Sequence, residues 1–162
     1  MIKNIYLISM IVSVFVFSCS DSPNQQQEAK TETKTQPEKK PNPQPVELTE
    51  AEKALAENGK AVYNTYCLSC HMEDGGGVPG MNPPLRKTDW VNGDKKRLIK
   101  VVLNGLSEDV EINGETYSNV MAPHDYLSDE DIASVLTFVR TNFENNSGAV
   151  SVEEVAAVRA SN

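Results

Sequence analysis

The sequence contains few side chains that bind metal ions or carry redox chemistry, with three cysteines and two histidines among 162 residues. A structural zinc site needs four ligands. The candidates in this sequence are Cys67, Cys70, His71 and His124. Because Cys70 and His71 are adjacent, they rarely both turn toward one small ion, which disfavours zinc. A thioredoxin-like redox pair needs strands alternating with helices, and the sequence shows no such strands.

The sequence also lacks an apolar run long enough to span a membrane comfortably, which takes about 20 residues. The run "IYLISMIVSVFVF" follows Lys3 and ends just before Ser18 and Cys19. It predicts a secretory signal peptide over residues 1–18, with an uncleaved anchor helix as the alternative. "VFSC" resembles a bacterial lipobox and predicts lipidation of Cys19. Either interpretation exports the protein and keeps it at a membrane, on the periplasmic side.

Apolar residues are nearly missing from the stretch that follows. "SDSPNQQQEAKTETKTQPEKKPNPQP" is rich in Gln, Lys, Glu, Thr and Pro. Such a segment cannot bury enough surface to offset chain entropy. Residues 19–47 are therefore predicted to form a disordered tether that begins at the lipidated cysteine.

The chain has no excess of positive charge, since 15 Lys and Arg residues stand against 23 Asp and Glu residues. Charges in the signal and the tether balance, so the acidic excess falls on the segment from Leu48 onward. The phosphates of nucleic acid would repel such a segment, which argues against nucleic acid as a partner. The same charge suits a partner protein with a basic docking face, because complementary charge speeds encounter.

Hydrophobic periodicity and capping residues predict four helical segments and one hairpin. They lie at residues 48–67, 93–105, 128–143 and 151–160, with the hairpin at 110–117. Thr49 with Glu52, and Ser128 with Asp131, form capping patterns at two helix starts. Gly59, inside the first helix, costs about 1 kcal/mol relative to Ala, which suggests close approach by another helix. The predicted fold is all-α.

Long loops at residues 71–94 and 105–128 separate these helices, and loops of this length are unusual unless something organises them. A small fold with so much irregular chain often needs a disulfide, a metal or a cofactor. The predicted organisation is one folded domain at residues 48–146, followed by a tail at residues 147–162 with a possible short helix.

The motif that meets this need is Cys67-x-x-Cys70-His71, the signature of covalent haem attachment. Two thiols one helical turn apart can each add to a vinyl group at the porphyrin edge. The adjoining imidazole can then reach the iron. The sequence therefore predicts one covalently attached haem c as the cofactor, held by these three residues.

A second axial ligand is expected on a distal loop, and Met121 is favoured because it lies just before the last helix, next to the stiffening Pro123. Met72 adjoins the predicted proximal histidine and cannot easily cross the ring. His124, Met81 and an open coordination position remain as alternatives.

From residue 48 to residue 145 the chain resembles the small, single-haem class I cytochromes c. The shared parts occur in this order: Gly59-x-x-x-Tyr63, the haem motif, Pro83-x-Leu85, Met121 and a closing helix. The stretch "NVMAPHDYLSDEDIASVLTFVRTNF" resembles the members that serve copper nitrite reductases, quinoprotein dehydrogenases and terminal oxidases. The resemblance implies a small cytochrome c fold, with helices and long loops wrapped around one covalent haem. It also implies that the first and last helices cross at the glycine and tyrosine of the first part.

The resemblance further implies roles for residues of the first long loop. The backbone carbonyl of Pro83 would accept a hydrogen bond from the His71 ring, and Leu85 would pack on the haem. Arg86 or Trp90 would hydrogen-bond a haem propionate. Surface charge for the arginine and core packing for the tryptophan remain the alternatives.

With His71 and Met121 both bound, the site is suited to passing electrons, and the expected function is a membrane-tethered electron carrier and no enzyme. A peroxidase or gas-binding haem protein is the alternative if the sixth position is open, with His124 as a distal group. Another alternative is a haem c subunit fixed within an oxidoreductase complex.

Overall fold

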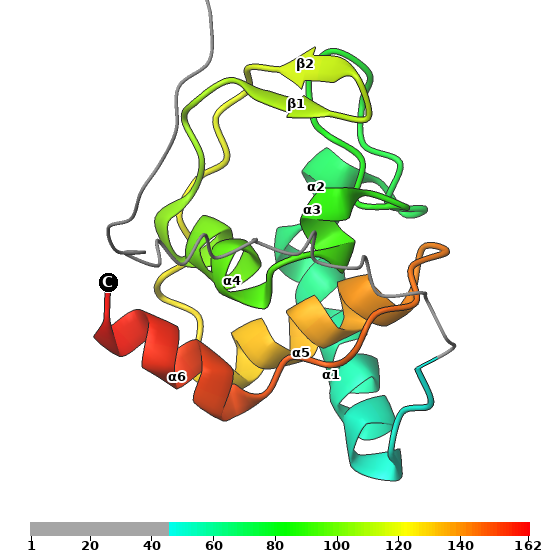
Figure 1. The fold of residues 1–162 in the computed structure, drawn as a ribbon, viewed down its shortest axis with the longest axis vertical. Coiled ribbons are helices and arrows are strands. Elements are labelled where there is room, and N and C mark those ends of the chain that lie inside the picture. The colour runs from blue at the N-terminus through cyan, green and yellow to red at the C-terminus, as the bar shows by residue number, and fades with distance from the viewer. Residues whose placement is uncertain (1–45) are drawn as a thin grey trace, which may run out of the picture. The chain divides into compact units, whose positions relative to one another are not determined.

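The computed structural model describes residues 46–162. The predicted signal peptide, the predicted lipidation site at Cys19 and all but the end of the predicted tether lie outside these residues. The described elements are α1 (Glu50–Tyr66), α2 (Leu68–His71), α3 (Asp89–Asn92), α4 (Lys95–Asn104), β1 (Val110–Ile112), β2 (Glu115–Tyr117), α5 (Asp129–Thr141) and α6 (Val152–Ala160) (Figure 1). The fold is all-α, as predicted, with one small hairpin.

The helix starts and the end of α4 follow the predicted capping residues. Thr49 with Glu52, and Ser128 with Asp131, form complete capping boxes at α1 and α5. Each box satisfies backbone N–H groups that have no partner inside the helix. Gly105 follows α4 with a φ of 72°, the left-handed conformation that glycine adopts without strain.

The last predicted helix ends earlier than expected, at Thr141. Phe143 and Glu144 have φ angles of 55° and 62°, so the chain turns away from the helix there. The prediction of a continuous helix over residues 128–143 was therefore wrong in its last two residues. Phe143 still packs on the core, because its ring lies 5.1 Å from that of Tyr63.

Helices α1 and α5 cross in direct backbone contact at Gly59. A Cβ atom on Gly59 would lie 2.0 Å from the carbonyl oxygen of Ser134, so only glycine fits. One turn further along α1, the buried ring of Tyr63 packs 5.5 Å from that of Phe138. The predicted crossing of the first helix with α5 at Gly59 and Tyr63 is confirmed. The crossing sets the position of the C-terminal end of α1 against α5.

One apolar cluster joins α1, α4, α5 and α6, and α6 contributes the fully buried Val155 and the buried Val158. Helix α6 packs against both α4 and α5 (Figure 1). The buried guanidinium of Arg140 donates to the backbone carbonyls of Val91, Gly93 and Gly148. This side chain on α5 thus holds both the chain at the end of α3 and the chain that leads to α6.

The two long loops contain short elements that the sequence did not predict, namely α3 and two isolated backbone bridges, and the short α2 precedes the first of these loops. The predicted hairpin is present, and its turn places Asn113 and Gly114 at φ angles of 55° and 82°. These angles match the turn that Asn-Gly favours. Among residues 46–162, no helix combines the length and the apolar composition needed to cross a membrane.

Replacing Gly59 with alanine tests the α1–α5 contact. In an isolated helix this change would be stabilising by about 1 kcal/mol. Here the added methyl group overlaps backbone atoms of α5, so we expect a loss of at least about 2 kcal/mol of unfolding free energy, measured by denaturant titration. Gly148→Ala is the matched control, because a Cβ there has no neighbour within 4 Å. Equal stabilities of the two variants would contradict the contact.

Candidate functional site

The cysteine motif lies on one helical turn at the end of α1. The backbone N–H of Cys67 donates to the carbonyl of Tyr63 at 2.9 Å, and that of His71 donates to the carbonyl of Cys67 at 3.0 Å. Both thiols are free, with Cys67 partly buried and Cys70 exposed. Burial raises the pKa of the Cys67 thiol to about 11, which keeps it protonated at neutral pH. Two thiols and one imidazole therefore share a single rigid turn.

The orientation of the His71 ring is fixed by the first long loop. Its Nδ1 atom lies 3.0 Å from the carbonyl oxygen of Pro83. A carbonyl only accepts, so Nδ1 carries the hydrogen, and Nε2 is left with a free lone pair. Burial lowers the pKa of His71, which favours the neutral ring. A neutral imidazole with one nitrogen held and the other free is the form that binds a metal.

The loop that carries Pro83 folds back tightly on itself. Gly77 has a φ of 67°, and a Cβ there would lie 2.3 Å from the carbonyl oxygen of Asn82 and 2.6 Å from that of Pro83. The N–H of Leu85 donates to the carbonyl of Gly75 at 2.8 Å, and its side chain packs against the core. Sequence reasoning missed Gly77, although the Gly75–Gly77 run was a visible signal of a strained turn.

Tyr63 links the helix crossing to the motif. Its buried hydroxyl donates to the carbonyl of Met72 at 2.7 Å. Burial raises the pKa of Tyr63, so the hydroxyl stays protonated and keeps donating. Met72 itself has a φ of 64°, which ends α2 directly after His71. The residue that packs α1 on α5 therefore also fixes the chain where it leaves the motif.

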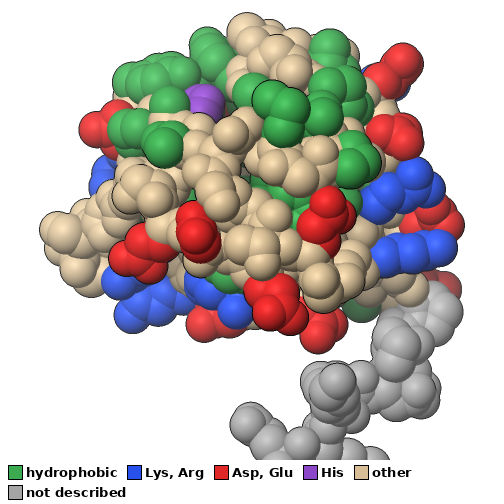
Figure 2. Space-filling model, turned by 90° about the horizontal axis from the view of Figure 1, so that it is seen from above, with side chains coloured by type: hydrophobic (Ala, Val, Ile, Leu, Met, Phe, Trp, Pro, Cys, Tyr) green, Lys and Arg blue, Asp and Glu red, His purple; other side chains and the backbone are tan. Residues whose placement is uncertain are grey.

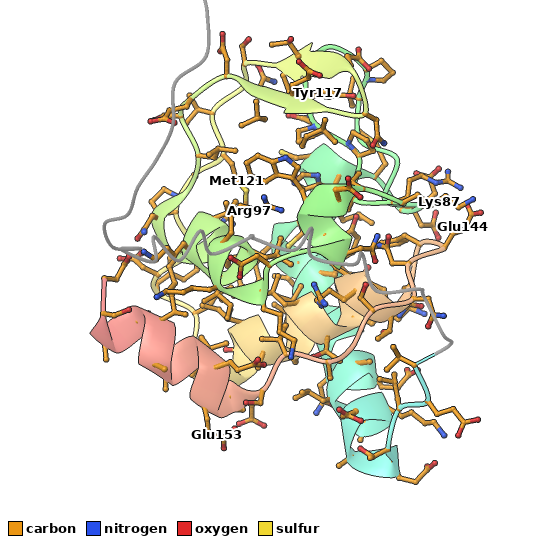
Figure 3. The ribbon with its side chains drawn as sticks, viewed as in Figure 1. Lys87, Arg97, Tyr117, Met121, Glu144 and Glu153 are labelled. Atoms are coloured by element: carbon orange, nitrogen blue, oxygen red, sulfur yellow. The ribbon has the colours of Figure 1, made fainter. Side chains whose placement is uncertain are left out.

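Met121 is held by its backbone in the second long loop. It forms an isolated bridge with Leu106, with N···O distances of 2.8 and 2.9 Å. A Cβ on Gly105 would lie 2.3 Å from the carbonyl oxygen of Met121, so this approach also requires glycine. The side chain of Met121 is partly buried and belongs to the loop that leads from β2 to α5 (Figure 3). Met81, by contrast, is 52% exposed.

His124 forms an aromatic cluster with two tyrosines that also contact each other. Its ring centroid is 6.4 Å from that of Tyr66 and 5.8 Å from that of Tyr126. Its Nδ1 atom is buried and has no hydrogen-bond partner among the described residues. A positive charge on His124 would further lower the pKa of His71. The two histidines of the chain therefore lie close enough to interact.

The two residues predicted to contact a propionate lie in different surroundings. Arg86 pairs with Asp74, at 3.0 Å, and with Glu144. Trp90 is partly buried, and the guanidinium of Arg97 lies over its ring, 4.5 Å from the centroid. This stacked pair borders an open cavity of about 650 Å³ along α4, which the motif residues do not line. Arg97 was missed because nothing in the sequence relates it to Trp90.

Asn145 joins several segments around the site. Its amide nitrogen donates to the carbonyls of Leu85 and Val139, and its amide oxygen accepts from the N–H of Lys87 and the side chain of Asn92. All four distances lie between 2.8 and 2.9 Å. One buried side chain thus connects α5, α3 and the loop after Pro83. No sequence signal distinguishes this asparagine from those in ordinary turns.

Exposed apolar side chains gather near the motif and the Met121 loop: Tyr66, Met72, Met81, Val120 and Tyr126. A hydrogen bond of 3.2 Å between the side chains of Asn119 and Asn82 joins the two long loops there. Figure 2 shows hydrophobic side chains collected along one side of a face, with one histidine among them. Charged side chains occupy the opposite side of that face. Such a patch is unusual for a surface without a binding role.

The family is decided by comparison with known proteins. The sequence profile described as cytochrome c matches residues 56–143. The chain belongs to the cytochrome c family. Proteins of this family are electron carriers, and their cofactor is covalently attached haem c. The expected cofactor and the expectation of a carrier are thereby confirmed.

Individual relatives are similar over part of their length. A cytochrome c-552 of Thermus thermophilus is 37% identical over 92 residues, which cover 54% of this chain and 62% of that protein. The cytochrome c subunit of the quinone alcohol dehydrogenase of Gluconobacter oxydans is 35% identical over 105 residues, 62% of this chain and 22% of that one. The cbb3-type cytochrome c oxidase subunit CcoP of Azospirillum brasilense is 40% identical over 60 residues, 33% and 20% of the two chains. The chain thus spans under two thirds of these relatives.

The donor groups at the site fit a covalently attached haem. Two free thiols lie on one turn beside an imidazole whose Nδ1 is already bonded, and exposed apolar side chains surround them. In the described part of the chain, no three His, Cys, Asp or Glu side chains are grouped to hold a metal ion as zinc would require.

Removing the carboxylate of Glu144 tests how the loop after Pro83 is held. Glu144 pairs with Lys87 (Figure 3) and with Arg86, and these cations lower the pKa of Glu144 from 4.5 to about 2. Because the folded pKa is depressed, the pairs stabilise the fold above pH 4.5, and this contribution is lost as the pH falls toward 2. Glu144→Gln should therefore lower the melting temperature slightly at pH 7 and leave it unchanged near pH 2.

The control for Glu144→Gln is Glu57→Gln, which removes an exposed carboxylate from α1. Both variants are melted at low and at high salt, since exposed ion pairs are screened. A loss for Glu144→Gln that persisted unchanged at pH 2 would show that charge is not its cause.

Proposed function

We propose that the protein is a membrane-tethered electron carrier on the periplasmic side of a bacterial membrane, with one haem c held by Cys67, Cys70, His71 and Met121. The observation that carries the proposal is the 3.0 Å contact between His71 Nδ1 and the carbonyl of Pro83, on the same turn as two free thiols. A ring held in this way presents its other nitrogen to a metal, and the two thiols suit covalent attachment.

The bound haem supplies a one-electron couple between ferric and ferrous iron. His71 and Met121 would be the two protein ligands of the iron, which would leave no site for a substrate, and the thioether of Met121 would raise the potential. Leu85, which packs against the core beside the Pro83 loop, would help to exclude water from the haem. The Pro83 carbonyl holds the Nδ1 hydrogen of His71 and so keeps the ring from rotating.

For the propionates we propose Trp90 together with Arg97. The guanidinium of Arg97 stacks over the Trp90 ring, and both residues line an open cavity, so the guanidinium would supply the positive charge for a carboxylate there. Arg86 already pairs with two carboxylates, Asp74 and Glu144, so its charge is neutralised locally. These pairs support a structural role for Arg86, in place of contact with a propionate.

The expected partner is a respiratory oxidoreductase with a basic docking face. Relatives include cytochrome subunits of a quinone alcohol dehydrogenase and of a cbb3-type oxidase. The β1–β2 segment exposes four carboxylates close together in the chain: Glu108, Asp109, Glu111 and Glu115. Opposite charge would steer a basic partner toward the molecule and make the rate of electron transfer fall with added salt.

A second candidate is a haem c subunit fixed within an oxidoreductase complex, which the names of the dehydrogenase and oxidase relatives favour. A fixed subunit needs an apolar contact surface. In α6, Val155 and Val158 are buried within the domain and Val152 is exposed. The exposed apolar side chains near the motif and the Met121 loop would be the contact surface of such a subunit.

An absorption spectrum of protein matured with covalent haem tests the proposed ligands. The oxidised protein should show a weak band near the red end that is lost on reduction and in Met121→Ala. The potential of that variant should fall by on the order of 0.2 V, within the roughly 0.8 V range that axial ligands span. Met81→Ala is the matched control and should keep both. A high-spin spectrum of the native protein that shifts with carbon monoxide would instead indicate an open position.

The proposed membrane attachment is tested by replacing Cys19. The native full-length protein should fractionate with membranes and carry a covalent lipid, detected by mass spectrometry. Cys19→Ala should lack the lipid, because the acceptor thiol is missing. A Cys19→Ala protein with the same membrane fraction and the same mass shift as the native protein would contradict lipidation at this residue.

A further inference from the structure

Helix α6 extends beyond the part of the chain that the family profile matches, which ends at residue 143. It is nevertheless packed into the domain, with Val155 and Val158 buried against α4 and α5. Its first turn is tied to the start of α4 by Lys95, whose ammonium lies 3.0 Å from both carboxylate oxygens of Glu154. Its last turn contacts a different region.

Arg159, near the end of α6, binds the segment that leads from Met121 to α5. Its Nη1 donates to the carbonyl of Asp125, its Nη2 to the carbonyl of Leu127 and its Nε to the carboxylate of Asp129. All three distances are 2.7 Å, at the short end of the range for hydrogen bonds from a charged donor. A planar guanidinium thus fixes three alternate residues of one short segment.

The chain end beyond α6 also reaches the other side of Met121. The side chains of Asn162 and Asn104 form two hydrogen bonds, at 2.5 and 2.9 Å. Asn104 ends α4, directly before Gly105 and Leu106, the residues in backbone contact with Met121. The residues from α6 to Asn162 therefore contact both the chain just before Gly105 and the chain that follows Met121.

Without these contacts, the segment after Met121 would be weakly held. Among residues 122–127 only Leu127 is buried in the core, and Tyr126 is 65% exposed, so side-chain packing holds chiefly the end of the segment. Between the bridge at Met121 and the start of α5, backbone bonds hold the segment at His124 and Leu127. Segments with few buried contacts open locally at low cost in free energy.

We propose that Arg159 is a positioning residue, through which α6 keeps the Met121 segment closed and slows displacement of Met121 from the haem iron. The inference rests on the proposed function, because it takes Met121 as the axial ligand. Opening of residues 121–127 would break the two charge-assisted hydrogen bonds to the carbonyls of Asp125 and Leu127. In Figure 1 this segment runs from the hairpin toward the start of α5, where α6 lies.

The test compares Arg159→Gln with Lys95→Gln in the full-length, haem-loaded protein. Each variant removes one cation, either Arg159 on α6 itself or Lys95, which pairs with α6. Lys95 contacts the first turn of α6 and no residue between 121 and 129. Imidazole is added to the oxidised protein, and its binding is followed by loss of the sulfur-dependent red band. Arg159→Gln should bind imidazole about tenfold faster than native protein, since charged hydrogen bonds contribute about this factor. Lys95→Gln should match the native rate.

Arg159→Lys provides a graded comparison, because an ammonium cannot reach all three acceptors in the planar geometry. Its imidazole rate should lie between those of the native protein and Arg159→Gln. Helical circular dichroism gives the global melting temperature of each variant. Imidazole rates that followed global stability across all variants, with Lys95→Gln as fast as Arg159→Gln, would overturn the positioning role.

Hydrogen exchange separates failure of this inference from failure of the proposed function. Exchange at the amides of Met121 and Leu127 should be faster in Arg159→Gln and unchanged in Lys95→Gln, whatever ligand the iron has. If native protein lacked the red band, Met121 would not be the ligand, and both the proposed function and its consequence here would be overturned. If the band were present but exchange and imidazole binding were native-like in Arg159→Gln, the inference alone would fail.

Discussion

The rest of the structure depends on the backbone contact between α1 and α5 at Gly59. It brings the two helices close enough for the ring of Tyr63 to pack in the core while its hydroxyl holds the carbonyl of Met72. The turn with Cys67, Cys70 and His71 follows directly from the end of α1. A wider crossing would move this turn away from the Pro83 carbonyl, so the packing of two helices sets the geometry of the site.

The remainder of the site is built from irregular chain, which is held by side-chain hydrogen bonds and by glycines where backbones touch. Gly77 and Gly105 allow the approaches that place Pro83 and Met121. Asn145 then fixes the loop after Pro83 to α5. In a domain this small, buried hydrogen-bonded groups of this kind supply part of the stability that a larger apolar core would otherwise supply.

Regular structure was predictable from the sequence because its causes are local. Capping boxes at Thr49 and Ser128, and the Asn113-Gly114 turn, involve residues within a few positions of one another. The haem motif is local too, so its three residues were found. Contacts across long sequence separations, such as the bonds of Asn145 to Leu85, Lys87 and Asn92, leave no such pattern. The early end of α5 was missed because the apolar periodicity continues to Phe143, although the helical backbone ends at Thr141.

The tip of the hairpin makes few contacts with the rest of the domain, unlike the remainder of the second loop. Ile112 and Tyr117 are buried, but a Cβ on Gly114 would meet no atom within 4 Å. The strands on either side pair with each other, so residues added at the turn would extend the ribbon into solvent. We therefore expect this turn to be the point where evolution can lengthen the chain, or an engineer can attach a label or an electrode linker, at little structural cost.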